Sequence, residues 1–166
     1  TMNERMLAFF EREKQDGFPF HHIHAAGRND WPQLCGEMEK RNLTSPMLDA
    51  RQYIYDMAVV MAAADLVISR AGASTLSELT ALGMPTILVP SPYVVANHQE
   101  KNARLLERHG GAVVLTEEEA DGDALYRETE AILHDTEKRT AMAMAMAQLG
   151  IPDATERIYR TLMSLL

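Results

Sequence analysis

Small and hydroxyl-bearing residues follow a short apolar run near the middle of the chain, at the start of an expected helix. Gly72 and Ala73 would let the backbone approach a ligand closely, because neither carries a large side chain. Ser74 and Thr75 offer hydroxyls beside the free N–H groups of the helix, a combination that suits a pyrophosphate. Glu78, one turn into the helix, would accept hydrogen bonds from both hydroxyls of a ribose. An ordinary capped helix has the same pattern, and spacing alone does not separate the two interpretations.

A second polar group follows the next expected strand across a proline-bounded loop and consists of Asn97, His98, Gln99 and Asn102. Because ligands of open parallel sheets bind beyond the carboxyl ends of the strands, this group would lie at the same edge as the first. Gln99 and Asn102 are three residues apart and share a helix face. Uncharged amides beside a histidine suit the hydroxyls of a sugar. A polar helix start without a ligand is the alternative.

A third candidate is the segment Ile54–Met57, again a strand end followed by a helix start. There an apolar residue with free backbone groups could hold the edge of a flat base. Taken alone, this step fits ordinary packing better than binding. The segment supports a binding site only together with the other two groups, since all three lie where an expected strand ends.

Other reactive residue types have simpler explanations. His22 and His24 would share one face of a strand while His21 points to the other, so the three histidines do not form a metal site. The acidic pair in Asp121–Asp123 is typical of a helix cap. The sequence has a single cysteine, Cys35, so an internal disulfide is excluded. Cys35 is expected to pack in a helix. We expect no bound metal, and no catalytic base is identifiable.

The elements that would position these groups alternate between helix and strand. Such alternation predicts an α/β fold, with a Rossmann-like parallel sheet flanked by helices. Asn3 is expected to cap the first helix, and the helix at 57–64 is expected to be mostly buried. Extended segments are expected at Phe18–Ala25, Gln52–Tyr55, Leu66–Ser69, Thr86–Val89 and Ala112–Leu115. Helices are expected at Glu4–Gln15, Trp31–Arg41, Met57–Ala64, Thr75–Leu82, Asn97 or His98 to His109, Gly122–Leu133, Glu137–Leu149 and Asp153–Leu166.

Composition narrows the classes of function. The 166 residues carry a net charge of -8, which disfavours binding to a nucleic-acid backbone. The longest wholly apolar run, Met57–Ala64, is far shorter than the roughly 20 residues of a membrane-spanning helix. The single cysteine fits a reducing cytosol, so we expect a cytoplasmic protein.

The stretch from Tyr53 to Glu117 resembles the C-terminal, donor-binding domain of the MurG family of bacterial N-acetylglucosaminyltransferases, which have the two-domain GT-B fold. That family carries an apolar-x-Asp-Met step, then ADLVIxRAGAxTxxE, GxPxILVPxP and DHQxxNA. The counterparts here, in the same order, are Ile54–Met57, Ala64–Glu78, Gly83–Pro92 and Asn97–Ala103. Asn97 departs from the family's aspartate. The family's glycine-rich loop and N-terminal domain have no counterpart in this sequence, so residues 1–166 look like the C-terminal half.

The resemblance implies a role for each matching residue. The donor would be UDP-N-acetylglucosamine, with Ile54 pairing the uracil edge through its backbone and Met57 packing beneath the base. Glu78 would hold the ribose hydroxyls. The diphosphate and the start of the sugar would meet Gly72, Ala73, Ser74 and Thr75, and the sugar hydroxyls would be read by Gln99 with His98 and Asn102 nearby.

The resemblance also implies a reaction and its setting. The family transfers N-acetylglucosamine, with inversion, to undecaprenyl-pyrophosphoryl-N-acetylmuramoyl pentapeptide, a step of peptidoglycan biosynthesis on which cell wall, cell shape and cell division depend. No cofactor is expected beyond the donor substrate. The N-terminal domain would supply the site for the lipid-linked acceptor and the catalytic base. It would also contact the membrane, on the cytoplasmic face of the plasma membrane. This chain alone is therefore expected to bind the donor without transferring the sugar.

Three alternatives stay open on the sequence. The chain could belong to a transferase that moves another UDP-sugar to a lipid or sterol. It could be a separate donor-binding subunit that works with an acceptor-binding chain. It could also be a non-catalytic module that senses nucleotide sugars.

Overall fold

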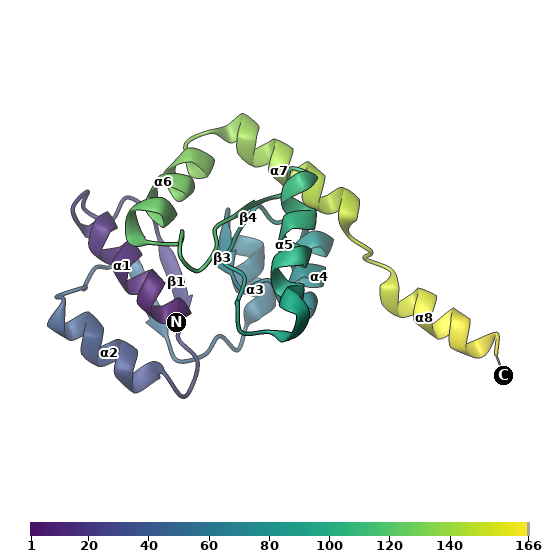
Figure 1. Cartoon of the computed structure of the whole chain (residues 1–166), viewed down its shortest axis with the longest axis horizontal. Coiled ribbons are helices and arrows are strands. Elements are labelled where there is room, and N and C mark those ends of the chain that lie inside the picture. Colours follow the sequence, from purple (N-terminus) through teal and green to yellow (C-terminus); the bar gives the residue numbers. More distant parts are fainter. Residues whose placement is uncertain (166) are drawn as a thin grey trace. The chain divides into compact units, whose positions relative to one another are not determined.

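A computed structural model describes residues 1–165 and, at Ala96, the backbone only. The chain forms two compact units (Figure 1). Unit 1 comprises Thr1–Asp65 and Leu115–His134, and unit 2 comprises Leu66–Val114 and the chain from Asp135 onward. The last residue of the helix expected at Asp153–Leu166 lies outside the described residues.

Unit 1 is built on two parallel strands and a pair of packed helices. Its elements are α1 (Met2–Lys14), β1 (His22–Ala25), α2 (Trp31–Lys40), β2 (Leu48–Arg51), α3 (Met57–Ala63) and α6 (Gly122–Leu133). β1 pairs with β2 so that His22 lies opposite Leu48. Helix α1 packs against α6 so closely that a Cβ on Gly122 would lie 2.4 Å from the Ala8 carbonyl oxygen. The core of unit 1 contains the fully buried Phe9, Phe10, Leu125 and Ile132.

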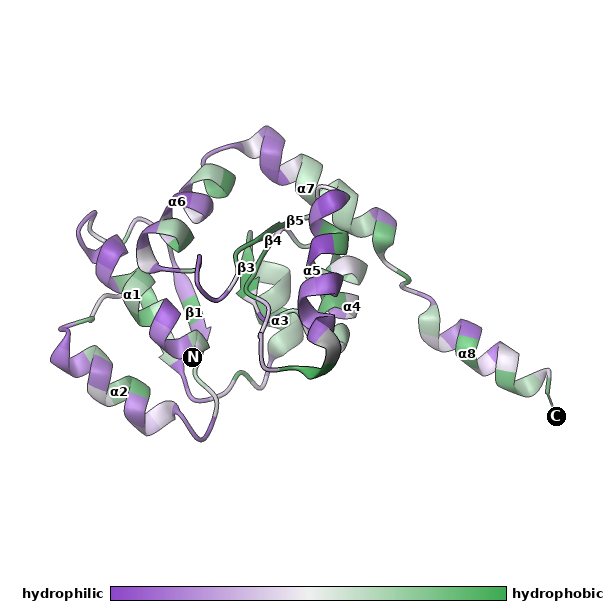
Figure 2. Ribbon diagram, in the orientation of Figure 1, coloured by the Kyte–Doolittle hydropathy of each residue, from purple (hydrophilic) through white to green (hydrophobic). Residues whose placement is uncertain are grey.

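Unit 2 contains the three-stranded parallel sheet that follows the expected α/β order. Its elements are β3 (Val67–Ser69), α4 (Ala73–Leu82), β4 (Thr86–Leu88), the 3-10 turn η1 (Val95–Asn97), α5 (His98–Arg108), β5 (Ala112–Val114), α7 (Thr136–Leu149) and α8 (Ala154–Met163). The strand order is β3-β4-β5, with Thr86 opposite both Val67 and Ala112. The central strand β4 is wholly buried, and the sheet strands are strongly hydrophobic (Figure 2).

Local sequence explains how α4 is delimited. Gly72 occupies its N-cap position in extended conformation, and Gly83 ends it in the left-handed conformation at φ 62°. Glycine adopts that conformation without strain, so the chain can turn directly into β4. The sequence places the helix start at Thr75, two residues later than the structure does.

The bounds of two predicted strands in unit 1 are wrong. The strand expected from Phe18 starts only at His22, because Phe18 has a positive φ of 57° and Pro19 has no N–H to donate. The extended piece expected at Gln52–Tyr55 is instead β2, four residues earlier, since pairing with β1 outweighs the strand preference of the two tyrosines.

Asn3 does not cap the first helix. Thr1 does, by accepting a hydrogen bond from the Glu4 N–H at 3.4 Å. The Asn3 side chain joins α1 to the end of β1, donating to the Ala26 carbonyl at 2.9 Å and lying 3.0 Å from His24 Nε2. A long-range role of this kind leaves no local signal in the sequence.

Two burial expectations are also wrong. In α3 only Met61 is buried, while Met57 and Val59 are exposed, because a helix of seven residues turns one narrow face to the interior. Cys35 is exposed, because the buried residue of α2 is its neighbour Leu34 and each helical step rotates the side chain by about 100°.

The predicted α/β class with parallel strands flanked by helices is confirmed. The described strands form two sheets, of two and three strands, where the sequence suggests one. None of the helices in residues 1–165 is both long enough and apolar enough to span a bilayer.

Candidate functional site

The first turn of α4 carries the residues predicted to meet a diphosphate. Gly72 has no side chain to cap the helix, and the first main-chain bond within it runs from the Leu76 N–H to the Gly72 carbonyl at 2.9 Å. Ala73 and Ser74 are exposed and Thr75 is half-buried. An uncapped helix N-terminus presents free N–H groups and a partial positive charge. This turn therefore has the chemistry that an anionic oxygen requires.

The space around Gly72 is open. Its φ of -69° is available to any residue, so the backbone does not require glycine here. A Cβ added at Gly72 would meet only the Thr75 hydroxyl, at the ordinary distance of 3.9 Å. Nothing inside the described chain thus accounts for a glycine at this position, whereas close approach of a ligand would.

Glu78 lies on the same side of α4 as Ser74 and Thr75, four and three residues earlier. Its side chain is exposed. The neighbouring hydroxyls are used within the helix, since Ser77 Oγ donates to the Ala73 carbonyl at 3.0 Å and Thr80 Oγ1 to the Leu76 carbonyl at 2.8 Å. The exposed carboxylate of Glu78 is the charged acceptor on this face of α4, beside the hydroxyls of Ser74 and Thr75.

The second predicted group lies where the chain enters α5. Asn97 adopts the left-handed conformation at φ 51°, which asparagine tolerates better than most residues. His98 Nδ1 lies 2.8 Å from the Val95 carbonyl oxygen and so closes the preceding turn. Gln99 and Asn102 are both half-buried and lie on one face of α5. Helix α5 starts at His98, the later of the two positions expected from the sequence, with Asn97 at its N-cap position.

Gln99 is already partly engaged. Its Oε1 accepts a hydrogen bond from the Ser91 N–H at 2.9 Å. The side-chain amide has one acceptor oxygen and an NH₂ group with two donors, so this bond determines which end of the amide faces away from Ser91. The amide that the sequence assigns to a sugar can donate through Nε2 while Oε1 holds the loop.

Arg70 is a residue to which the sequence analysis assigns no role. Its Nη1 donates to the Val89 carbonyl at 3.0 Å and to the Pro90 carbonyl at 3.4 Å. The Val89 N–H in turn donates to the Ser69 carbonyl at 2.9 Å, so the ends of β3 and β4 lie side by side. The sequence signals that this stretch needs side-chain partners but does not indicate which residues supply them. Prolines at 90 and 92 remove backbone donors, which indicates that side chains must supply partners there.

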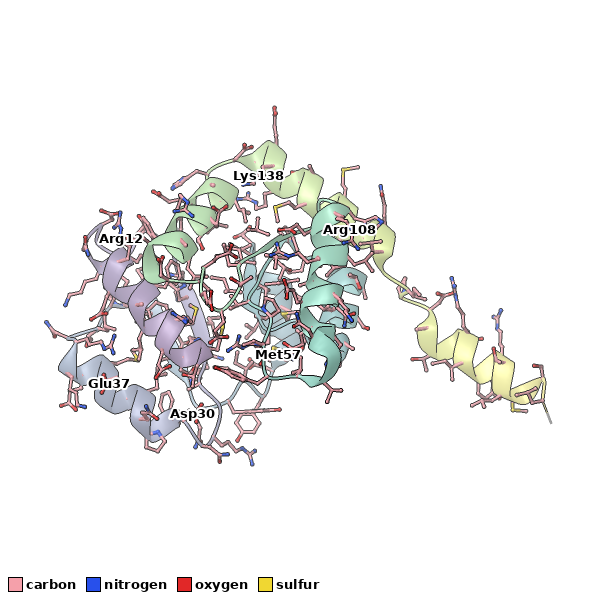
Figure 3. The ribbon with its side chains drawn as sticks, viewed as in Figure 1. Arg12, Asp30, Glu37, Met57, Arg108 and Lys138 are labelled. Atoms are coloured by element: carbon pink, nitrogen blue, oxygen red, sulfur yellow. The ribbon has the colours of Figure 1, made fainter. Side chains whose placement is uncertain are left out.

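The predicted base-binding residues belong to unit 1, whereas the other eight predicted residues belong to unit 2. Ile54 is buried, with 7% of its surface exposed, and Met57 at the start of α3 is 44% exposed (Figure 3). Tyr53 and Tyr55 on either side of Ile54 are exposed, and their rings meet edge to face at 5.0 Å. Asp56 takes the N-cap position of α3 but makes no capping bond, and its carboxylate lies 3.6 Å from Arg51.

Among the described residues, each unit has a surface hollow. One of about 270 Å³ follows α5 and is lined by Asn97, Glu100, Lys101, Arg104 and Arg108, the last of which is labelled in Figure 3. A smaller one of about 120 Å³ lies in unit 1 between α1 and α2. Neither of the two is lined by residues 72–78, whereas the lining of the larger one includes Asn97 of the second predicted group.

The histidines of β1 serve packing in unit 1. His22 Nε2 lies 2.6 Å from a carboxylate oxygen of the fully buried Glu13, and its ring packs edge-on against Phe9. Burial, together with the nearby His22, lowers the pKa of His24 to about 4. Within residues 1–165 no three histidine, cysteine or acidic side chains gather as a metal site would require. Asp121 caps α6 as predicted, accepting from the Ala124 N–H at 2.7 Å.

Comparison with known proteins gives a consistent result. The family described as "Glycosyltransferase family 28 C-terminal domain" matches residues 1–158. The chain is 49% identical over 160 residues to the UDP-N-acetylglucosamine--N-acetylmuramyl-(pentapeptide) pyrophosphoryl-undecaprenol N-acetylglucosamine transferase of Acetivibrio thermocellus, covering 96% of this chain and 42% of the relative. It is 40% identical over 140 residues to the enzyme of the same name from Bacillus pumilus, covering 84% of this chain and 38% of the relative. The chain thus spans less than half the length of these curated relatives.

Solved structures agree. The crystal structure of MurG from Acinetobacter baumannii matches with a TM-score of 0.72 and 28% identity, covering 86% of this chain and 42% of that one. CalG4, the calicheamicin glycosyltransferase, matches with a TM-score of 0.71 and 20% identity, covering 98% of this chain and 40% of that one. The second likeness concerns the fold alone.

Proposed function

The chain belongs to the glycosyltransferase family 28 C-terminal domains, and we propose that it binds UDP-N-acetylglucosamine as the sugar donor of a transferase. Its fold is that of the C-terminal part of GT-B glycosyltransferases. The curated relatives with 49% and 40% identity are named for transfer of N-acetylglucosamine to a lipid-linked N-acetylmuramyl pentapeptide, and we propose the same donor and acceptor here.

The observation that carries the proposal is the open, uncapped start of α4. The free N–H groups of Ala73, Ser74 and Thr75 would meet the diphosphate, with the missing side chain of Gly72 leaving room for it. Glu78 on the same face of the helix would accept from the ribose hydroxyls. Fixed dipoles at this position would also stabilise the charge that develops on the departing UDP.

The two ends of the donor would be held by the remaining residues. The backbone of Ile54 would pair with the uracil edge, and the exposed Met57 would pack beneath the base. Gln99 would donate from Nε2 to the sugar hydroxyls, with His98 and Asn102 beside it. These roles follow the family motifs and remain proposals for each residue.

The proposed reaction is an inverting displacement. The 4-hydroxyl oxygen of the muramoyl sugar forms a bond to the anomeric carbon of N-acetylglucosamine while the bond to the UDP oxygen breaks, and the hydroxyl proton passes to a base. The relatives extend well beyond the part that this chain matches. We propose that the acceptor site, the base and the membrane contact belong to that further part, at the cytoplasmic face of the membrane. We propose no metal or cofactor for the residues of this chain.

Titration calorimetry with the 166-residue chain tests the proposal. We expect saturable binding of UDP and of UDP-N-acetylglucosamine, and no product when the chain alone is mixed with the lipid-linked acceptor. ADP serves as the matched control and should bind more weakly, because the uracil edge is part of the site. Absence of UDP binding, or equal binding of ADP, would contradict the proposal.

A further inference from the structure

Two side chains from different elements hold the same stretch of backbone beyond β4. Arg70, directly after β3, donates from Nη1 to the carbonyl oxygens of Val89 and Pro90 at 3.0 and 3.4 Å. Gln99, in the first turn of α5, accepts from the Ser91 N–H at 2.9 Å. Three consecutive residues are therefore fixed by side-chain hydrogen bonds.

This stretch needs such partners because of its prolines. Pro90 and Pro92 have no N–H, so the Ser91 N–H is the single backbone donor between them. Strand β4 ends at Leu88, yet Val89 is still fully buried. A buried carbonyl or N–H without a partner is costly, and Arg70 and Gln99 supply the partners that a continuing strand would have supplied.

The hydrogen bonds also connect two parts of the site. Arg70 lies two residues before Gly72, which opens α4, and Gln99 lies at the start of α5. The segment Val89–Ser91 lies between them and is bonded to both. Whatever fixes this segment also fixes the direction in which the Gln99 amide presents its NH₂ group.

We propose, on the basis of the proposed function, that Arg70 is a positioning residue for recognition of the donor sugar. By holding Val89 and Pro90 it places the Ser91 N–H, which holds Oε1 of Gln99 and leaves Nε2 directed to the sugar. Arginine suits this role better than lysine, because its planar guanidinium fixes several donors in one plane and can bridge two carbonyl groups. The effect of Arg70 on the ligand is indirect, through the loop.

The test substitutes Arg70→Lys in the 166-residue chain, with Arg157→Lys on α8 as the matched control, since Arg157 pairs with Asp153 far from this segment in the sequence. Calorimetry measures the affinity for UDP and for UDP-N-acetylglucosamine. Amide exchange followed by NMR measures protection of the Ser91 N–H, and thermal unfolding measures the fold.

In Arg70→Lys we expect the affinity for UDP-N-acetylglucosamine to fall about tenfold while the affinity for UDP changes by less than about twofold. We expect the Ser91 amide to exchange about tenfold faster and the melting temperature to stay within a few degrees. Arg157→Lys should change none of these. If Arg70 only stabilised the fold, Arg70→Lys would weaken the binding of UDP and of UDP-N-acetylglucosamine to the same extent.

Equal losses for UDP and UDP-N-acetylglucosamine, or unchanged exchange at Ser91, would overturn the inference and leave the proposed function intact. Failure of the unaltered chain to bind either ligand would contradict the proposed function and the inference with it.

Discussion

Glu78 is the residue on which ribose recognition depends in this account. Its carboxylate is exposed on the face of α4 that also carries Ser74 and Thr75. An exposed side chain that packs against little can be replaced without unfolding the protein. Loss of ligand binding without loss of stability is therefore the behaviour expected of a binding residue here.

We predict that Glu78→Ala weakens UDP binding by about 1.5–3 kcal/mol, the range for hydrogen bonds to a charged group. Calorimetry at constant salt measures the change, and thermal unfolding checks the fold. Glu137→Ala, an exposed glutamate in the first turn of α7, is the matched control and should leave UDP affinity unchanged. A sharp drop in melting temperature with unaltered UDP affinity would make Glu78 a structural residue.

Gln99 has two separable roles, because its oxygen holds Ser91 and its NH₂ group is proposed to face the sugar. We predict that the unaltered chain prefers UDP-N-acetylglucosamine over UDP-N-acetylgalactosamine by about 1–3 kcal/mol, since an inverted hydroxyl leaves part of the amide unpaired. Both Gln99→Ala and Gln99→Glu should erase the preference and bind UDP nearly as before. A competition series with the three ligands provides the measurement.

Gln99→Ala and Gln99→Glu are expected to differ in how well the Ser91 N–H is protected from exchange. Gln99→Glu keeps an oxygen for the Ser91 N–H, so protection of that amide should persist, whereas Gln99→Ala should lose it. Equal affinity of the unaltered chain for the two sugars would remove Gln99 from sugar recognition.

At the scale of elements, helix α4 and strands β3–β5 could be predicted because their signals are local. Gly83 ends α4 and the apolar strands are short and uninterrupted, so sequence alone places them within one or two residues. Strand β2 could not be placed, because LDAR has no strand pattern of its own and extends only by pairing with β1. The same holds for Asn3, whose hydrogen-bond partners lie 21, 23 and 27 residues away along the chain.

The residues of the candidate site likewise divide into those that the sequence could predict and those that it could not. Hydroxyl and amide residues at strand ends, such as Thr75 and Gln99, could be selected from their types and positions. The bond between Gln99 and Ser91, and the role of Arg70, depend on how β3, β4 and α5 meet, and no residue pattern specifies that geometry.

The open start of α4 gives a prediction of its own. Gly72→Ala should leave the melting temperature nearly unchanged, because the backbone conformation is ordinary and the new Cβ has room. We expect it to weaken UDP binding about tenfold by placing a methyl group where the diphosphate approaches. Calorimetry and thermal unfolding measure the two effects.

Gly150→Ala is the contrasting variant. A Cβ there would lie 2.6 Å from the Thr80 carbonyl oxygen, so it should lower the melting temperature clearly. If Gly72→Ala behaved like Gly150→Ala, Gly72 would be required by the fold and not by a ligand.

At the scale of the whole molecule, a buried histidine makes the stability of the fold depend on pH. In unit 1 the pKa of His24 is lowered to about 4, chiefly by burial and secondly by His22. The unfolded chain would take up a proton near pH 6.5 and the folded chain only near pH 4, so stability falls as the pH drops through that window. Glu13, whose carboxylate oxygen lies 2.6 Å from His22 Nε2, is the buried carboxylate of the same packing group.

We predict that the loss reaches about 3 kcal/mol between pH 7 and pH 4. Urea unfolding followed by fluorescence of Trp31, the single tryptophan, reports on unit 1. His24→Gln keeps a polar partner for Asn3 without titrating and should show a much smaller loss, whereas His21→Gln, at an exposed position, should behave like the unaltered chain. Equal pH dependence in all three proteins would contradict this explanation.

Binding of a nucleotide sugar with its diphosphate at the start of α4 can be tested by NMR titration of the labelled chain with UDP. We predict that the amide signals of Ala73, Ser74 and Thr75 shift together as UDP is added, with one saturation curve shared by the Ile54 amide. The same titration with Glu78→Ala should reach saturation only at higher UDP concentration. Saturating shifts confined to other segments, with the α4 amides unmoved, would contradict the account.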